Sequence, residues 1–327
     1  MPELPEVQTI VNDLNKKVVG RRIVGVWFDW PKMLKDPLDQ QKNKIAHKHV
    51  AIFEKVIKGK KILKVVRRAK NILIYLSGDF LLLIHLKMTG HLLIGKWKVV
   101  GKKTIPLEPK EVVEDPYNQY IHLIFYLDPV RSRSPQGGRS HSLKARAASN
   151  GVDDGAMLAL SDLRKFAKAL LGTKEQIENL PEIKNLGPEP LDPSFKFAEF
   201  VKLIKSERRK IKQVLMDPEV IAGIGNIYSD DILWAAKIHP FKPANKLGNQ
   251  ELGSLYKAIR KVLEKALKLR GTSYSDYRDT SGKEGGYADY RLVYQREDEP
   301  CRRCKTAIVR VKLGGRSAHF CPKCQKL

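Results

Sequence analysis

The chain has 327 residues, of which 42% are hydrophobic, a composition typical of a globular protein with more than one core and not of a disordered chain. It has no apolar run long enough to span a membrane and no basic start followed by an apolar stretch, so we expect a cytoplasmic protein without membrane contact. Its 61 Lys and Arg against 36 Asp and Glu give a net charge of +25, spread along the chain. This excess favours nucleic acid over a membrane surface, because no amphipathic anchor or lipidation signal accompanies it.

The chain begins Met1-Pro2-Glu3-Leu4-Pro5-Glu6. An initiator Met before a small residue is commonly removed, and its removal would leave Pro2 as a free secondary amine. An α-amino group has a pKa of about 7.7–8.0, against about 10.4 for lysine, so a sizeable uncharged fraction exists at neutral pH. Such an amine can attack a carbonyl-like carbon and form a Schiff base, and Glu3 could move protons beside it. Taken alone, the segment is at least as compatible with an unstructured start.

Apolar residues at helical spacing from Pro5 to Val18 predict an N-terminal helix that Pro5 could start. Short apolar runs with turns between them then predict strands over 23–30, 49–53, 62–66, 72–76, 81–86, 121–127 and 157–160. Gly78-Asp79 is expected to form a hairpin turn between two of them. Many short strands of this kind indicate a β-sandwich or barrel.

Residues 129–156 interrupt the strand pattern, because they are rich in Ser, Arg, Gly and Ala and offer little to a core. We expect them to form a long, flexible insertion. A linker follows at Leu186-Gly187-Pro188-Glu189-Pro190-Leu191. Beyond it, helices are predicted over 195–206, 211–216, 227–236 and 250–269, and then a polar, Gly-containing loop over 271–286.

All four cysteines lie near the C-terminus, in the pattern Cys301-x2-Cys304-x16-Cys321-x2-Cys324. Two disulfides are an alternative, but they suit secreted domains and would be awkward within two close CxxC pairs. Paired CxxC knuckles match tetrahedral Zn²⁺, and their spacing is that of a zinc ribbon. We therefore expect one structural zinc ion, and we interpret His319, between the knuckles, as a surface or DNA-facing residue rather than a ligand.

Six segments complete the pattern: Pro2-Glu3-Leu4-Pro5-Glu6-Val7, Arg67-Arg68-Ala69-Lys70, His85-Leu86-Lys87-Met88-Thr89-Gly90, Asp162-Leu163-Arg164-Lys165-Phe166, Gly223-Ile224-Gly225-Asn226-Ile227-Tyr228 and Gly315-Arg316-Ser317-Ala318-His319-Phe320-Cys321. In this order they resemble the bacterial formamidopyrimidine-DNA glycosylase family, repair enzymes that excise oxidised purines and then cleave the strand. The resemblance covers almost the whole chain outside residues 129–156. One of these motifs alone would be weak, but the ordered set is highly specific.

The resemblance implies an α+β multidomain fold with an N-terminal β-sandwich and flanking helix, a helix–two-turn–helix (H2TH) domain and a C-terminal zinc-finger β-hairpin. The expected divisions are a catalytic domain over 1–174, a linker over 175–190, a helical domain over 191–286 and a zinc finger over 287–327. Damaged double-stranded DNA is the implied partner. The resemblance also implies a monomer without an obligate protein partner, associated with the nucleoid of a bacterial cytoplasm.

The resemblance also assigns the chemistry. Pro2 matches the nucleophile that attacks C1′ of a flipped nucleotide, expels the base and forms an iminium, after which β- and δ-elimination cleave the strand. Glu3 matches the acid/base carboxylate and Glu6 a second carboxylate close to the site, although Glu6 could simply support the first helical turn. Lys70 matches the lysine that assists elimination, and Arg316 matches the residue at the lesion phosphates credited with the δ step.

Four further residues match DNA contacts of the family, and a fifth residue is a candidate for one. Met88, Arg164 and Phe166 match the trio that fills the gap left by the flipped base. Asn226 matches a phosphate contact at a helix N-terminus. Lys212 is a second candidate for phosphate, with a solvated helix face as its alternative. Core positions for Met88 and Phe166 are the alternative for the trio.

Two other functions stay open at this point. One is an endonuclease VIII-like enzyme for oxidised pyrimidines, against which Leu4 and the intact trio weigh. The other is a DNA-binding protein that keeps the fold without the chemistry, against which Pro2, Glu3, Lys70 and Arg316 weigh. The loop over 274–290 lies where family members cap the flipped base, and its specificity residues are not assigned.

Overall fold

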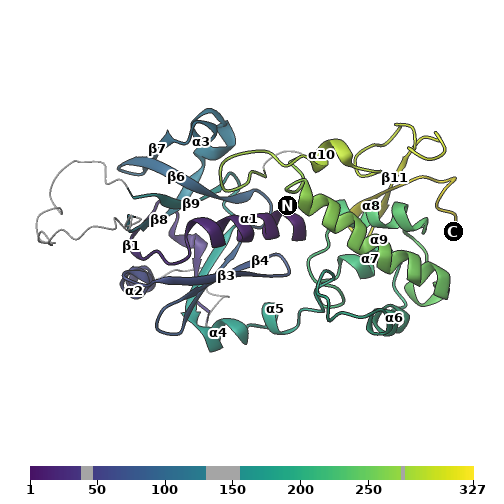
Figure 1. Ribbon diagram of the computed structural model, residues 1–327, viewed down its shortest axis with the longest axis horizontal. Helices are drawn as coiled ribbons and strands as arrows, with labels where there is room; N and C mark the ends of the chain where they lie inside the picture. The colour runs from purple at the N-terminus through teal and green to yellow at the C-terminus, as the bar shows by residue number, and fades with distance from the viewer. Residues whose placement is uncertain (38–46, 130–154, 274–276) are drawn as a thin grey trace, which may run out of the picture.

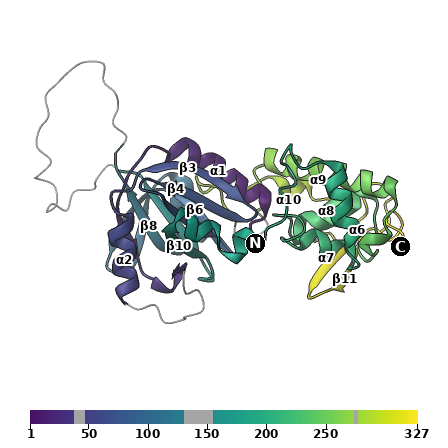
Figure 2. The same ribbon diagram turned by 90° about the horizontal axis from the view of Figure 1, so that it is seen from below.

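The computed structural model describes residues 1–37, 47–129, 155–273 and 277–327. The predicted insertion over 129–156 lies outside these residues except at its two ends. The described chain forms a β-rich half and a helical half, and the N-terminus lies where the two halves meet (Figures 1 and 2). None of the helices in the described ranges has the length and apolar character that a bilayer-spanning helix needs.

Two five-stranded sheets form the β-rich half, which confirms the predicted sandwich. The first sheet has the order β1 (Ile23–Phe28), β8 (Ile121–Leu127), β9 (Met157–Asp162), β6 (Gly90–Val100) and β7 (Lys103–Glu108). The second has the order β2 (Leu34–Lys35), β10 (Lys168–Thr173), β5 (Phe80–His85), β4 (Asn71–Leu76) and β3 (Ile62–Arg68). Neighbouring strands pair antiparallel except β10 with β2. The β4–β5 hairpin turns over residues 77–79, where Gly78 and Asp79 both have positive φ, so the predicted turn position is confirmed.

Two chain segments cross from one sheet to the other at the same end of the sandwich. Residues 86–89 connect β5 of the second sheet with β6 of the first, and residues 163–167 connect β9 of the first with β10 of the second. Asp162 holds the two crossings together, because its carboxylate accepts the Thr89 hydroxyl and the backbone N–H of Ala167. The two crossings therefore form one surface.

Helix α1 (Leu4–Lys17) connects the two halves. Its residues Val7, Ile10 and Leu14 are fully buried in the sandwich core, in the spacing that predicted the helix. Burying a side chain of this size contributes about 1.5–3 kcal/mol. The first residue, Leu4, belongs instead to the core of the helical half, and its backbone N–H donates to Gly223 O at 3.0 Å. The N-terminal arm is therefore fixed by both cores.

Helix α2 (His47–Ile57) replaces a predicted strand over 49–53, and that prediction is wrong. The short apolar run fits both the two-residue repeat of a strand and the 3.6-residue repeat of a helix. In the structure Phe53 and Ile57 are buried at a spacing of four residues, while Ile52 is 47% exposed. This is the pattern of a helix with one buried face. Strands β6, β7 and β10 were not among the predicted strands, because polar and charged residues interrupt their apolar pattern.

The helical half matches the predicted helices closely. It comprises α6 (Phe197–Ser206), α7 (Ile211–Met216), α8 (Asn226–Ala236), α9 (Asn249–Lys268), α10 (Tyr287–Tyr290) and the hairpin β11 (Val309–Leu313) with β12 (Arg316–Phe320). Short segments α4 (Lys174–Glu178) and α5 (Pro181–Lys184) lead into it from the sandwich, and α3 (Lys110–Glu114) follows β7. The 3₁₀ turns are η1 (Pro31–Met33), η2 (Pro116–Gln119) and η3 (Ala244–Lys246). Helix α8 is buried on most sides, against α9 and the hairpin.

Candidate active site

The N-terminal arm places Pro2 at the junction of the two halves. Pro2 is buried, whereas Met1 is 44% exposed. The Glu6 side chain caps the start of α1, because the backbone N–H of Glu3 donates to Glu6 Oε2 at 2.8 Å. This cap fixes the direction in which Pro2 leaves the helix.

The Glu3 carboxylate lies against the N-terminus of α8 in the other half. It accepts the backbone N–H groups of Gly225 at 2.7 Å and of Ile227 at 2.9 Å, and the residue is only 2% exposed. Free N–H groups and the positive end of the helix dipole make this a favourable site for a carboxylate. A Cβ on Gly225 would lie 2.4 Å from Glu3 Oε1 and 2.7 Å from Lys70 Nζ. Glycine at position 225 is therefore required for Glu3 and Lys70 to meet there.

Lys70 reaches this point from the turn between β3 and β4. Burial lowers its pKa, the carboxylates of Glu3 and Glu6 oppose that shift, and the positive charge of Arg316 adds to it. A lysine with a lowered pKa carries a larger uncharged fraction and can accept a proton more readily. Arg316 comes from the zinc hairpin. The charged and polar groups around Lys70 therefore come from four elements: α1, the sandwich, α8 and the hairpin.

The Glu6 carboxylate is buried next to Glu3 and accepts hydrogen bonds from three protein groups. Besides the Glu3 N–H, its carboxylate accepts the Tyr228 hydroxyl and the Thr272 N–H, and the residue is 1% exposed. Burial and the nearby Glu3 charge raise its pKa. These contacts favour a structural role for Glu6 over contact with substrate. They agree with the alternative that Glu6 supports the first turn of the helix.

A cavity of about 460 Å³ opens beside Met1, Lys70 and His85. Burial, together with the charges of Lys87, Lys168 and Lys70, lowers the pKa of His85 to about 3. The imidazole is therefore neutral at physiological pH. Of the three lysines, Lys168 pairs with Glu182 at 2.6 Å, whereas Lys70 and Lys87 line the cavity. Sequence reasoning missed His85 although it lies in a quoted motif, because a single histidine after an apolar strand carries no signal of its own.

Sequence reasoning also missed Glu189 in the linker. Its carboxylate accepts the Ala69 backbone N–H at 2.6 Å and pairs with Arg67 at 2.5 Å and Arg68 at 3.3 Å. Ala69 has a φ of 51°, which is uncommon for a residue with a side chain. Glu189 thus holds the turn that presents Lys70. The run of two arginines before Ala69 was the only available signal for a part-buried carboxylate partner.

The predicted gap-filling trio lies together on the two sheet crossings. Met88 is 41% exposed and Phe166 57% exposed, so neither is a core residue. Arg164 Nη1 lies 3.6 Å from the sulfur of Met88. Because large exposed apolar side chains are unusual on a tight turn, this cluster fits a surface that inserts into a base stack.

Asn226 and Lys212 have different environments. Asn226 is the first residue of α8, and its side-chain Oδ1 is buried with no hydrogen-bond partner among the described residues. Lys212 is 1% exposed, and its ammonium contacts Asp230 and the Ser317 carbonyl instead of solvent. The predicted phosphate contact of Lys212 is therefore corrected to a buried ion pair, because the start of α7 packs directly under the hairpin.

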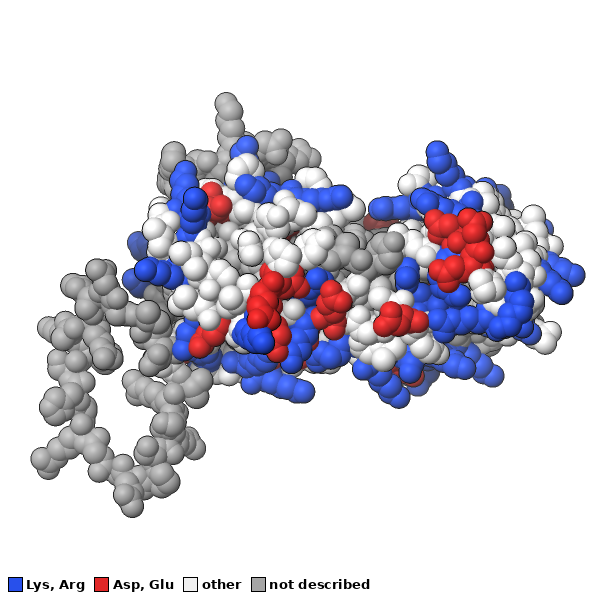
Figure 3. Space-filling view, turned by 90° about the horizontal axis from the view of Figure 1, so that it is seen from above, with Lys and Arg blue, Asp and Glu red and all other residues white. Residues whose placement is uncertain are grey.

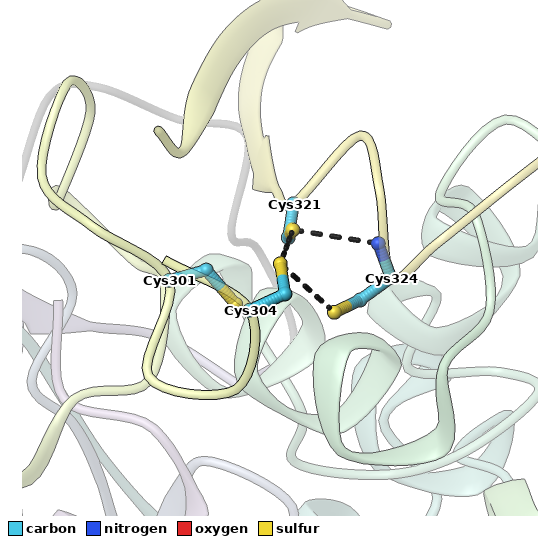
Figure 4. A group of neighbouring side chains, drawn as sticks. All are labelled: Cys301, Cys304, Cys321 and Cys324. Atoms are coloured by element: carbon cyan, nitrogen blue, oxygen red, sulfur yellow. Dashed lines mark hydrogen bonds between the residues drawn. The ribbon is translucent and has the colours of Figure 1, made fainter. Parts of the chain in front are cut away.

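The four cysteines form one cluster at the base of the hairpin (Figure 4). Their sulfur atoms all lie within 4.8 Å of one another, and the Sγ atoms of Cys304 and Cys321 are 3.4 Å apart. This set fits a single tetrahedral Zn²⁺ with Zn–S bonds of about 2.3 Å. The expected surface position of His319 is wrong: the residue is 2% exposed and its ring bonds to Asp230. It is not within the cysteine cluster.

Comparisons with known proteins agree with this architecture. The family model of the formamidopyrimidine-DNA glycosylase N-terminal domain matches residues 1–169, that of the H2TH domain of the same enzymes matches 186–278, and that of a zinc finger found in FPG and IleRS matches 298–327. Together they define a DNA-repair glycosylase class of fold with one structural zinc ion.

Individual relatives match over the full length of the chain. The formamidopyrimidine-DNA glycosylase of Heliobacterium modesticaldum is 35% identical over 326 residues, covering 100% of both chains. That of Pelotomaculum thermopropionicum is 35% identical over 327 residues, again covering 100% of both. The Lactococcus lactis Fpg solved with abasic-site DNA superposes with a TM-score of 0.76 at 29% identity, covering 99% of this chain and 100% of that one. The chain therefore belongs to the formamidopyrimidine-DNA glycosylase family.

Proposed function

We propose that this protein is a bifunctional DNA glycosylase and abasic-site lyase of base excision repair that removes oxidised purines, including formamidopyrimidines. The observation that carries the proposal is the approach of Glu3, next to Pro2 in the chain, and Lys70 at Gly225, with the charge of Arg316 acting on Lys70. Solved Lactococcus lactis Fpg complexes hold abasic-site DNA and Fapy-dG DNA, which supports the same lesion class here.

The chemistry begins at the Pro2 nitrogen once Met1 is removed. The nitrogen lone pair forms a bond to C1′ while the C1′–base bond breaks, and the departing base takes the electron pair and a proton. The Pro2 nitrogen, now bonded to C1′, then releases its own proton and regains a lone pair. The C1′–O4′ bond then opens, O4′ takes a proton, and C1′ becomes an iminium carbon. Glu3, next to Pro2 and held by the α8 amides, is the group placed to exchange these protons.

The iminium acts as an electron sink for two eliminations. Removal of a C2′ proton forms the C2′=C3′ bond and expels the 3′ phosphate, which is the β step. Removal of a C4′ proton then forms the C4′=C5′ bond and expels the 5′ phosphate, which is the δ step. Lys70 suits proton removal because burial lowers its pKa, and Arg316 suits the negative charge of a departing phosphate.

DNA contact is proposed along the junction. Asn226 and the α8 N-terminus, together with His85 and its lysines, would bind phosphates, while Met88, Arg164 and Phe166 would fill the gap in the duplex. Lys and Arg side chains lie over both halves on the face shown in Figure 3, with Asp and Glu in smaller separate patches. A basic surface across both halves supports binding of a long polyanion.

We further propose that the protein acts as a monomer in the bacterial cytoplasm, on nucleoid DNA, without an obligate protein partner, and that its domains divide at residues 174, 190 and 286.

A trapping experiment tests the proposal. Duplexes holding 8-oxoguanine or thymine glycol are mixed with protein whose N-terminus is confirmed as Pro2 by mass spectrometry, and borohydride is added to reduce any iminium. We expect a covalent adduct with 8-oxoguanine DNA. An adduct with thymine glycol alone would instead indicate an enzyme for oxidised pyrimidines, and binding without any adduct would indicate a DNA-binding protein that lacks the chemistry.

A further inference from the structure

A buried ion pair connects helices α7 and α8 beneath the zinc hairpin. Lys212 Nζ lies 2.5 Å from Asp230 Oδ1, and the two side chains are only 1% and 0% exposed. A buried pair of this kind is often no more stabilising than apolar residues of similar volume. Fold stability therefore does not by itself account for charged residues at this position.

The remaining polar atoms of the pair are directed to the strand that begins with Arg316. Lys212 Nζ donates to the Ser317 carbonyl at 2.7 Å. Asp230 Oδ2 accepts from the His319 backbone N–H at 3.0 Å and lies 2.9 Å from His319 Nδ1. The pair thus binds β12 at Ser317 and at His319, the first and third residues after Arg316.

The Ser317 contact lies toward the end of β12 that is away from the zinc cluster. Cys321 follows directly after β12, so the metal site fixes the base of the hairpin, whereas Arg316 is at its far end. The turn before Arg316 also rests on α7, because a Cβ on Gly314 would lie 2.7 Å from Gln213 Nε2. Helix α7 and Asp230 therefore hold the end of the hairpin that carries Arg316.

Helix α8 relates this end of the hairpin to the catalytic carboxylate. The N–H groups of Gly225 and Ile227, at the start of α8, hold the Glu3 carboxylate. Asp230, just over one turn from Gly225 along the same helix, holds β12. A helix is a rigid spacer over this distance, so it sets the position of Arg316 relative to Glu3 and Lys70.

We propose that Asp230 is a positioning residue which, through Lys212 and His319, sets the place of Arg316 and thereby the extent to which strand cleavage proceeds from β- to δ-elimination. This inference rests on the proposed lyase function. The affected step is the removal of the C4′ proton with departure of the 5′ phosphate, while formation of the iminium at Pro2 and loss of the 3′ phosphate do not need Arg316 to be in place.

The test compares products on a duplex with a single abasic site. The main variant is the double substitution Lys212→Met with Asp230→Leu, which removes both charges together and avoids leaving one buried and unpaired. Lys212→Met alone removes the contact with Ser317, and Lys212→Arg retains a charged donor. Lys210→Met is the matched control, because the Lys210 ammonium lies over the Phe241 ring and does not touch the hairpin.

Three quantities are measured for each variant: the ratio of δ to β product, the yield of borohydride-trapped adduct, and the zinc content. We expect the double variant to lose about tenfold in the δ/β ratio, since a displacement of about 1 Å can cost a catalytic group up to about 100-fold. Its adduct yield and zinc content should match those of the parent protein. Lys212→Met should show a smaller loss, Lys212→Arg should recover part of it, and Lys210→Met should show none.

Each other outcome rejects a specific claim. A parental δ/β ratio in a double variant that keeps its zinc would overturn the positioning role. A joint fall of ratio, adduct and zinc in every variant would show that the pair only supports folding, which also overturns it. If the parent protein itself forms neither adduct nor δ product, the proposed lyase function fails, independently of Asp230.

Discussion

The carboxylate of Glu189 accepts the backbone N–H of Ala69 at 2.6 Å, so the linker between the two halves holds the turn that presents Lys70. Glu189→Ala would leave this N–H without its acceptor and would remove the carboxylate that pairs with Arg67 and Arg68. Leaving buried donors unsatisfied costs about 1–3 kcal/mol in the free energy of unfolding. We expect that loss, together with β-elimination at an abasic site slowed by about tenfold through misplacement of Lys70. Denaturant unfolding and single-turnover cleavage measure the two effects.

Glu178→Ala is the matched control for this variant. Glu178 accepts the Tyr75 hydroxyl at 3.0 Å from the same sheet but does not touch the turn before Lys70. Cleavage by this control should equal that of the parent protein. Equal cleavage by Glu189→Ala as well would contradict the role given to Glu189.

A methyl group at position 225 should disable the site without unfolding the protein. In Gly225→Ala the added Cβ would meet Glu3 Oε1 at 2.4 Å, so the carboxylate must leave the α8 amides. We expect excision of 8-oxoguanine to fall by about 100-fold or more, as for other displaced catalytic groups. Gly253→Ala is the control, since nothing lies within 4 Å of its Cβ and it lies inside α9. It should keep full activity and gain about 0.5–1 kcal/mol of stability.

The rate of β-elimination should depend on pH through Lys70. Burial and Arg316 lower the pKa of this ammonium, so its uncharged, proton-accepting form appears at a lower pH than for a free lysine. The rate should therefore rise with pH and level off below the ordinary lysine pKa. Removing the positive charge in Arg316→Ala should raise the pKa of Lys70 and move this rise to higher pH.

Arg302→Ala serves as the control for that shift, because Arg302 lies over the Tyr290 ring and bonds to the Asp289 carbonyl, away from Lys70. Its pH profile should coincide with the parental one. An unshifted profile for Arg316→Ala would mean that the two cations do not interact in the working enzyme.

Removal of zinc should be visible through one tryptophan. The Trp234 indole N–H lies 3.3 Å from Cys301 Sγ, and the other three tryptophans lie in the β-rich half. A strong chelator should release the metal, loosen the hairpin and change the emission of Trp234, while DNA affinity falls. Trp234→Phe should lose the emission change but still lose affinity. Undiminished DNA binding after zinc release would show that the finger is dispensable.

The exposed trio should matter for DNA and not for stability. Phe166→Ala removes a side chain that is 57% exposed, so the free energy of unfolding should change by less than about 0.5 kcal/mol. Excision of 8-oxoguanine should slow by about tenfold, because the unstacked duplex loses its apolar filler and unstacking costs a few kcal/mol. Leu163→Ala, 43% exposed on the same crossing, is the comparison, and an equal loss there would remove the special role of Phe166.

Strong local signals predicted much of this molecule. The spacing of Val7, Ile10 and Leu14 gave α1, the paired CxxC knuckles gave the zinc cluster, and ordered motifs gave the family. Short apolar runs were ambiguous. Helix α2 was mistaken for a strand because five residues are too few to tell the repeat of a strand from the repeat of a helix. The sandwich itself followed from the number of strands, although β6, β7 and β10 were missed.

Residues whose role depends on a distant partner could not be predicted. Lys212 looks like a solvated lysine until the fold places Asp230 beside it, and His319 looks exposed for the same reason. Glu189 and His85 act through turns and cavities that only tertiary packing creates. Glu6 carries the same carboxylate as Glu3, and only the donors around it, above all Tyr228, separate the two.

The contact of Glu3 with the α8 amides limits how this enzyme can be recombined. Joining this β-rich half to the helical half of a relative would keep Pro2, Glu3 and Lys70 together, yet the Glu3 carboxylate would then rest on a foreign helix. Such a chimera depends on a donor with glycine at the position of Gly225 and on a Leu4 that still fits its helical core. The two halves must therefore be exchanged together. A crossover in the linker would separate Glu3 from Gly225, which fit each other so closely that one added methyl group would displace the carboxylate.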